Sequence, residues 1–201
     1  MALMSKALKR DMEVALCQNT AKNAGNATTA RQTRSFEAWI TTNKSRGTGG
    51  ADGSASAAAT DAATGNRRAL TEALLKGVLQ SMFTNGAEPK MAIAGPVNKG
   101  VISGFTGRAN TRQNVSADTV SASISVYASD FGELQIVPSN RSRDRSLLLV
   151  DPEYAKVAYL RNFQTMDIAK IGDADTKMIL AEYGLEMSNE AAHGIVADLT
   201  A

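Results

Sequence analysis

The clearest hydrophobic pattern in the chain is helical and opens the sequence. Over residues 1–18, apolar side chains recur at the spacing of one helix face, while the charged side chains fall on the other faces. The apolar stripe comprises Met4, Leu8, Met12, Ala15 and Leu16. We therefore expect an amphipathic helix over residues 1–18 that packs this stripe against a core.

Further helices and a strand are predicted between residues 71 and 104. Thr71 can cap a helix whose apolar face runs to Met82 and which ends at 85–86, because Gly86 tolerates the left-handed conformation that ends helices. The run MAIAG at 91–95 predicts a short buried strand, and Pro96 can open a shorter helix that ends at Gly104. This order is typical of a mixed unit of helices and strands.

Alternation predicts the strands that follow. Over 120–128, apolar side chains alternate with serines and Tyr127, so we expect a strand with the apolar set buried, namely Val120, Ala122, Ile124, Val126 and Ala128. The SDFG turn at 129–132 leads to a partner strand that Pro138 ends. A charged turn, 141–145, precedes a buried strand at 147–150, and 151–152 then favours a short helix through Val157.

The last third predicts a long two-stranded ribbon. Its two strands flank a polar turn at 172–176, and one face of the second strand is apolar, carrying Ile179, Ala181, Tyr183, Leu185 and Met187. A ribbon of this kind has too little core of its own, so we expect it to lie on the first helix or on another chain. Residues 194–200 predict a last short strand.

Residues Arg46 to Gly65 are nearly all Gly, Ala, Ser, Thr and Asp. This composition cannot build a packed core and predicts a long mobile loop. Its glycines are not followed by Gly-Lys-Ser/Thr and do not lead from a strand into an apolar helix, which argues against a phosphate-binding loop.

Composition and charge narrow the function further. The 201 residues contain 22 Lys and Arg against 20 Asp and Glu, a net charge of +2, which disfavours a protein that grips phosphate backbones over a broad face. The single cysteine, Cys17, excludes an internal disulfide and a multi-cysteine metal site, and favours a reducing compartment. No window approaches the roughly 18 apolar residues of a membrane span, so we expect no membrane partner.

Reaction chemistry is not evident in the sequence. His193 is the only histidine, and we expect a structural role for it; the acidic residues are spread out rather than clustered. We therefore expect no enzyme activity, no metal and no cofactor. Arginines at 31–34 and 141–145 could bind phosphate or the carboxylates of an adjacent subunit. The near-neutral net charge of the chain favours carboxylates. Our candidates for a subunit interface are Arg31, Arg34, Arg141, Arg143, Arg145, Arg161, Glu182 and Glu186.

Whole segments in order carry a resemblance to a known family. LKRDMEVALCQN, RALTEALLKGVLQSMFTNG, AGPVNKGVISGFTG, DPEYAKVAYLRNFQT and AEYGLEMSNEAAHG stand in this order, and the chain over roughly residues 6–200 resembles the major capsid proteins of tailed bacteriophages. The resemblance implies an α+β chain with the Hong Kong 97-like shell fold. Residues 1–21 would be the spine helix of the peripheral domain, 22–155 the axial domain, 156–190 the β-ribbon of the peripheral domain, and 191–201 the final strand returning to the axial domain.

The same resemblance implies a function. The chain would be a structural subunit that self-assembles into the icosahedral, DNA-containing head of a tailed phage or prophage. Its partners would be copies of itself in hexamers and pentamers, possible other head proteins, and packaged double-stranded DNA by proximity alone. It would occupy the virion capsid, and the bacterial host cytoplasm during assembly. Family members carry an N-terminal arm and an extended loop before the spine that this sequence lacks. The alternative is therefore a truncated relative that co-assembles with a phage shell and blocks it.

Overall fold

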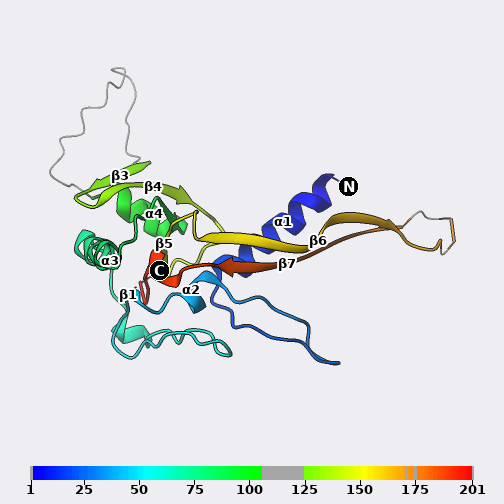
Figure 1. Cartoon of the computed structure of the whole chain (residues 1–201), viewed down its shortest axis with the longest axis horizontal. Helices are drawn as coiled ribbons and strands as arrows, with labels where there is room; N and C mark the ends of the chain where they lie inside the picture. Colours follow the sequence, from blue (N-terminus) through cyan, green and yellow to red (C-terminus); the bar gives the residue numbers. More distant parts are fainter. Residues whose placement is uncertain (1, 106–124, 171, 174–175, 201) are drawn as a thin grey trace, which may run out of the picture.

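A mixed sheet with helices packed on it and a ribbon that leaves the sheet make up the chain (Figure 1). The computed structural model describes residues 2–105, 125–170, 172–173 and 176–200. The elements in chain order are α1 (Ala2–Cys17), α2 (Phe36–Trp39), β1 (Asn43–Ser45), η1 (Thr64–Asn66), α3 (Glu72–Thr84), β2 (Met91–Ala94), α4 (Pro96–Ser103), β3 (Val126–Ser129), β4 (Gly132–Pro138), β5 (Leu147–Val150), β6 (Ala155–Asp167), β7 (Lys177–Met187), η2 (Glu190–Ala192) and β8 (Gly194–Val196).

The first helix forms as predicted, but only half of its apolar stripe is covered. Met12 and Leu16 are buried, whereas Met4 is 66% exposed. The inner half of α1 packs near α2 and the ribbon, and the outer half extends beside the ribbon away from the sheet (Figure 1). The stripe therefore leaves apolar surface exposed on the outer half of the helix.

The main sheet has six strands in the order β1-β8-β5-β2-β4-β3. The predicted strand at 147–150 lies inside it as β5, antiparallel to both β2 and β8. Leu147 and Leu149 face a core built with α3, whereas Leu148 and Val150 face a second core that includes Phe36. A strand covered on both faces has no polar side, which explains its continuous apolar run.

The two helices predicted between residues 71 and 104 are confirmed, and so are the residues at which they begin and end. The side-chain oxygen of Thr71 accepts a hydrogen bond from the backbone N–H of Leu74 at 3.4 Å and caps α3. Gly86 follows α3 with φ +77°, the left-handed conformation that ends the helix. Pro96 opens α4, and Gly104 caps its C-terminal end.

The predicted burial of the strand at 120–128 is wrong where it can be compared. Residues 120–124 lie outside the described residues. In β3, Tyr127 is 8% exposed while Val126 is 50% exposed, and Ala128 is exposed as well. Tyr127 pairs in register with Leu134 of β4, and its hydroxyl donates to Oε1 of Glu72 at 3.0 Å. A tyrosine with a polar partner buries more apolar area than an alanine, so the opposite face turns inward.

The short helix expected from residue 151 to Val157 does not form. Residues 152–154 make a turn, in which the N–H of Glu153 donates to Oδ1 of Asp151 and the N–H of Tyr154 to its carbonyl. From Ala155 the chain is already strand, because it pairs with β7 in the register Ala155↔Met187. Pairing across the ribbon replaces the helix that the local sequence favours.

The stretch 46–65 is irregular up to the start of η1, as its composition predicts, but side chains from other parts of the chain hold its backbone, which the prediction of a mobile loop did not include. The buried carboxylate of Asp198 accepts hydrogen bonds from the N–H of Gly47 at 2.9 Å and of Ala62 at 2.7 Å. Asn19 bonds both the N–H and the carbonyl of Ala59. Ala59 and Ala62 are themselves buried. Side chains from distant parts of the sequence therefore hold both arms of this loop.

The ribbon of β6 and β7 is antiparallel and extends away from the main sheet (Figure 1). At its base, Tyr183, Leu185 and Met187 pack against the core cluster that contains Leu16 and Phe36. The prediction that the ribbon lies on the first helix is thereby confirmed for this end. Within the part of the chain that the structure describes, no helix is both long and apolar enough to cross a bilayer.

Candidate subunit interface

The charged turn at 141–145 points into its own chain. Nη1 of Arg143 lies 2.9 Å from Oε2 of Glu37, and its Nη2 pairs with Asp61. Nη1 of Arg145 lies 3.2 Å from the same Asp61 carboxylate. These two candidates therefore find carboxylates within the chain, where the sequence had suggested those of a neighbour.

Glu37 is the buried centre of this group, with 1% of its side chain exposed. The hydroxyl of Ser146 donates to its Oε2 at 3.0 Å, and Nη1 of Arg46 lies 3.9 Å from its Oε1. Burial raises the pKa of Glu37, and the positive charges of Arg143 and Arg46 act against that rise. The group joins α2 to the turn before β5 and so stabilises the fold.

Arg34 and Arg141 are also engaged within the chain. Nη2 of Arg34 donates to the carbonyl of Ala38, and its guanidinium lies 4.4 Å from the ring centroid of Trp39. Burial lowers the pKa of Arg34. Arg141 accepts a hydrogen bond at its carbonyl from Nε2 of Gln18 at 2.7 Å. The side chain of Arg34 thus supports the passage from α1 into the sheet, whereas Arg141 contributes through its backbone carbonyl, and its buried Nε has no hydrogen-bond partner among the described residues.

The ribbon candidates lie at the surface. Nε of Arg161 and Oε2 of Glu182 form a cross-strand ion pair at 3.1 Å, with 54% and 36% of their side chains exposed. Glu186 is exposed opposite Lys156 in the register. Neither Glu186 nor the exposed Arg31 forms an ion pair with another described residue. Arg31 and Glu186 are thus exposed charges without a close ion pair among the described residues, although Lys156 stands opposite Glu186; the guanidinium groups of Arg34 and Arg141 form no ion pair there either.

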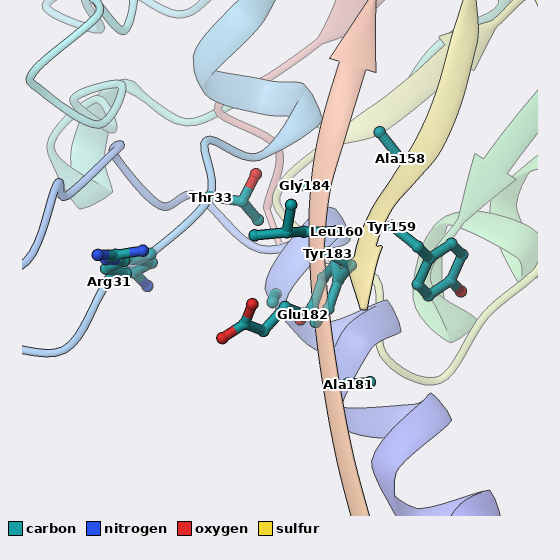
Figure 2. Close-up of a pocket in the computed structure, with 11 residues that line it drawn as sticks. Arg31, Thr33, Ala158, Tyr159, Leu160, Ala181, Glu182, Tyr183 and Gly184 are labelled. Carbon is teal, nitrogen blue, oxygen red and sulfur yellow. The ribbon is translucent and has the colours of Figure 1, made fainter. Parts of the chain in front are cut away.

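A groove of about 650 Å³ lies where the segment 31–33 runs beside the ribbon (Figure 2). Its lining includes three small residues of the ribbon: Ala158 and Gly184, which pair across the two strands, and Ala181, which lies on the other face of β7. The side-chain oxygen of Thr33 accepts a hydrogen bond from the N–H of Leu185 at 3.0 Å and fixes the segment to β7. Arg31 stands on the wall of this groove.

Sequence reasoning missed the most exposed ribbon residue at this groove. The register passes from Tyr159↔Tyr183 directly to Arg161↔Glu182, so Leu160 has no partner on β7. This bulge leaves Leu160 79% exposed. Figure 2 shows it on the same side of the ribbon as Thr33 and Glu182, with Tyr159 on the other side. The alternation of apolar and polar residues that predicts a strand does not show where an extra residue interrupts the pairing, so the sequence could not reveal this bulge.

Exposed apolar side chains gather on the ribbon and the outer half of α1. They comprise Leu3, Met4, Val157, Tyr159, Leu160, Met166, Ile168 and Met178, each between 37% and 80% exposed. Large apolar side chains left exposed on one part of a chain are typical of a protein interface when they form a patch. The same elements that bury little within the chain therefore offer the surface that a partner would cover.

The thiol and the imidazole, the side chains best suited to reaction chemistry, are buried and lie away from this exposed surface. Burial raises the pKa of the Cys17 thiol to about 11, which keeps it protonated and unreactive at neutral pH. His193 is fully buried at the base of the ribbon, and no cluster of His, Cys, Asp or Glu among the described residues could hold a metal ion. Among the described residues, the thiol of Cys17 and the imidazole of His193 are therefore both withdrawn from the surface.

Comparison with known proteins adds an independent observation. The model of one family, SU10 major capsid protein, matches residues 1–200. No curated protein matches the chain. Among solved structures, the chain is similar to one described as a virus-like particle from Pyrococcus furiosus, with 13% sequence identity and a TM-score of 0.41, covering 64% of this chain and 52% of that one.

Proposed function

This chain belongs to the SU10 major capsid protein family, and we propose that it associates with many copies of itself into the closed shell of a tailed-phage head. Its role is structural, as a subunit of the virion capsid. The family match over residues 1–200 is the observation that carries this conclusion. Repetition of one subunit by symmetry closes a shell through contacts that are each modest.

The surface of the chain supports association with copies of itself. Apolar residues on α1 and the ribbon, such as Leu3 at 80% and Leu160 at 79%, remain exposed. The ribbon extends beyond the main sheet, which places this surface within reach of neighbours (Figure 1). Burial of apolar area at about 25 cal/mol per Å² would provide the main driving force for assembly.

The finer architecture is part of the same proposal. The arrangement of a six-stranded sheet, a long helix and a separate two-stranded ribbon fits a Hong Kong 97-like subunit. In it, residues 22–155 and 191–201 would form the axial domain, and 1–21 with 156–190 the peripheral domain. Copies would group into hexamers and pentamers, with other head proteins joining them.

We extend the proposal to the setting of the protein. The chain would assemble in the host cytoplasm, lie near packaged DNA without reading it, and catalyse no reaction. The near-neutral net charge of +2 supports contact with DNA by proximity alone. No observation favours the alternative of a truncated relative that blocks a shell.

Electron microscopy and sedimentation of the purified chain test the proposal. We expect capsomer-sized oligomers or shells whose fraction rises with protein concentration. The particles should show rings or closed shells built from one kind of subunit. A chain that stays monomeric at every concentration and salt condition would overturn the proposal that it assembles with itself.

A further inference from the structure

We infer that two copies of this chain pack face to face at the ribbon groove, each inserting Leu160 into the groove of the other. The inference rests on the proposed self-assembly and names one contact within it. Leu160 is itself part of the lining of the groove and lies on the side of the ribbon where Thr33 and Glu182 line it (Figure 2). A projection and a hollow on one surface are self-complementary about a two-fold axis.

The bulge gives Leu160 the position of an anchor. An ordinary strand residue here would have a cross-strand partner, but the register skips Leu160 and leaves it 79% exposed. Bulges that re-aim a side chain recur at functional surfaces. A single exposed apolar side chain needs no explanation. Leu160, however, also lines a groove of about 650 Å³, so the equivalent groove of a second copy offers a cavity for it.

The groove can accept a leucine. Ala158 and Gly184, which pair across the ribbon, contribute little side-chain volume to its lining. The hydrogen bond from Leu185 to Thr33 holds the wall of the groove against β7, so the hollow does not collapse onto the ribbon. A well-packed apolar centre surrounded by polar groups is the usual form of an energetically important contact.

The charges near the groove favour a second copy of this chain over a partner that is strongly acidic or strongly basic. Arg31 on the groove wall and Glu186 on β7 are both exposed and form no ion pair with the described residues. Glu186 lies on the same face of β7 as Glu182 and Gly184, because alternate residues share a face. A two-fold axis would bring Arg31 of each copy to Glu186 of the other. A strongly acidic or basic partner would match one of these charges and repel the other.

Charge exchange between copies tests this contact. We would prepare Arg31→Glu and Glu186→Arg separately and measure self-association by sedimentation velocity over a dilution series. Each variant alone should associate roughly tenfold more weakly, because like charges would face each other in both places. An equimolar mixture of the two should recover association, since each copy then meets an opposite charge. Recovery in the mixture is specific to pairing between chains, because pairing within one chain gains nothing from mixing.

The apolar anchor has its own test. Leu160→Asp should weaken association by at least about tenfold, as truncation of a central contact does, while its thermal unfolding midpoint should stay unchanged because the side chain is exposed. Glu88→Arg, an exposed charge change on the sheet-bearing part, is the matched control and should associate normally.

The outcomes separate this contact from the general function. Undiminished association of Leu160→Asp, or no recovery in the charge-exchange mixture, would overturn the paired groove while leaving the shell function in place. Failure of the unmodified chain to associate would instead overturn the proposed self-assembly.

Discussion

Arg143 and Glu37 meet across 106 positions of sequence, with Nη1 of the arginine 2.9 Å from Oε2 of the glutamate. The side chain of Glu37 is 1% exposed and that of Arg143 13%. The pair connects α2 with the turn that leads into β5. Both charged groups are largely buried, and burying either charge without its partner would cost free energy. Each group is therefore stabilised by the other.

Arg143→Ala should destabilise the fold strongly. It would leave the Glu37 carboxylate buried with weaker compensation, a loss of about 3–5 kcal/mol for a buried pair broken on one side. Arg145→Ala is the control, because its side chain is 42% exposed and pairs with the same Asp61; its loss should stay below about 1 kcal/mol. Urea unfolding measures both, and equal losses would show that Glu37 does not need Arg143.

The stability of the protein should fall as pH drops below about 6.5, and His193 should be the cause. Nδ1 of this fully buried imidazole accepts a hydrogen bond from the N–H of Asp151 at 3.3 Å, and burial lowers the pKa of His193. The folded state therefore favours neutral imidazole. Above the pKa of the unfolded state, His193 is neutral in both states and its contribution to stability is fully present. Below that pKa the unfolded chain binds a proton that the folded chain resists, so the free energy of unfolding falls by at most about 1.4 kcal/mol per pH unit.

His193 is the only histidine, so its NMR titration reports the group directly. Unfolding free energies between pH 8 and pH 5 give the matching thermodynamic measurement. His193→Gln should flatten the dependence in the upper part of this window. An imidazole that titrates at or above its ordinary pKa would contradict this account.

Asp198→Asn should loosen the loop at 46–65. Oδ2 of Asp198 accepts from Gly47 and Oδ1 from Ala62, and the residue has φ +59°, which asparagine tolerates. The amide keeps one acceptor oxygen, so one buried N–H loses its partner at a cost of about 1–3 kcal/mol. Limited proteolysis with a broad-specificity protease should cut within 46–65 faster than in the unmodified chain. Asp130→Asn, an exposed change, should leave the cleavage rate unaltered.

Met12→Asp and Met4→Asp should differ sharply, although the residues share one helix stripe. Met12 is 6% exposed and Met4 66%. A carboxylate at position 12 would be buried without a partner and should cost about 3 kcal/mol or more, whereas the change at position 4 should stay within about 0.5 kcal/mol. Similar losses in denaturant melts would mean that the inner half of α1 does not rest on the core.

Local order along the chain is enough to predict much of this protein. The stripe of α1, the cap of α3 at Thr71, the end of that helix at Gly86 and the apolar run of β5 depend on neighbours within a few residues. Their propensities and their packing agree, so pattern and structure coincide. The order of whole segments also suffices to predict the capsid family, which the match over residues 1–200 confirms.

Partners far apart in sequence account for the rest. Tyr127 is buried because it bonds Glu72 and pairs with Leu134. After Asp151 the chain forms a strand because it pairs with β7. The loop at 46–65 is held by hydrogen bonds to Asp198. Arg143 and Arg145, two of the interface candidates, pair with Glu37 and Asp61 of their own chain, and an unpaired position on β6 exposes Leu160. Each of these outcomes depends on which distant groups compete for one side chain, and that competition exists only once the chain has folded.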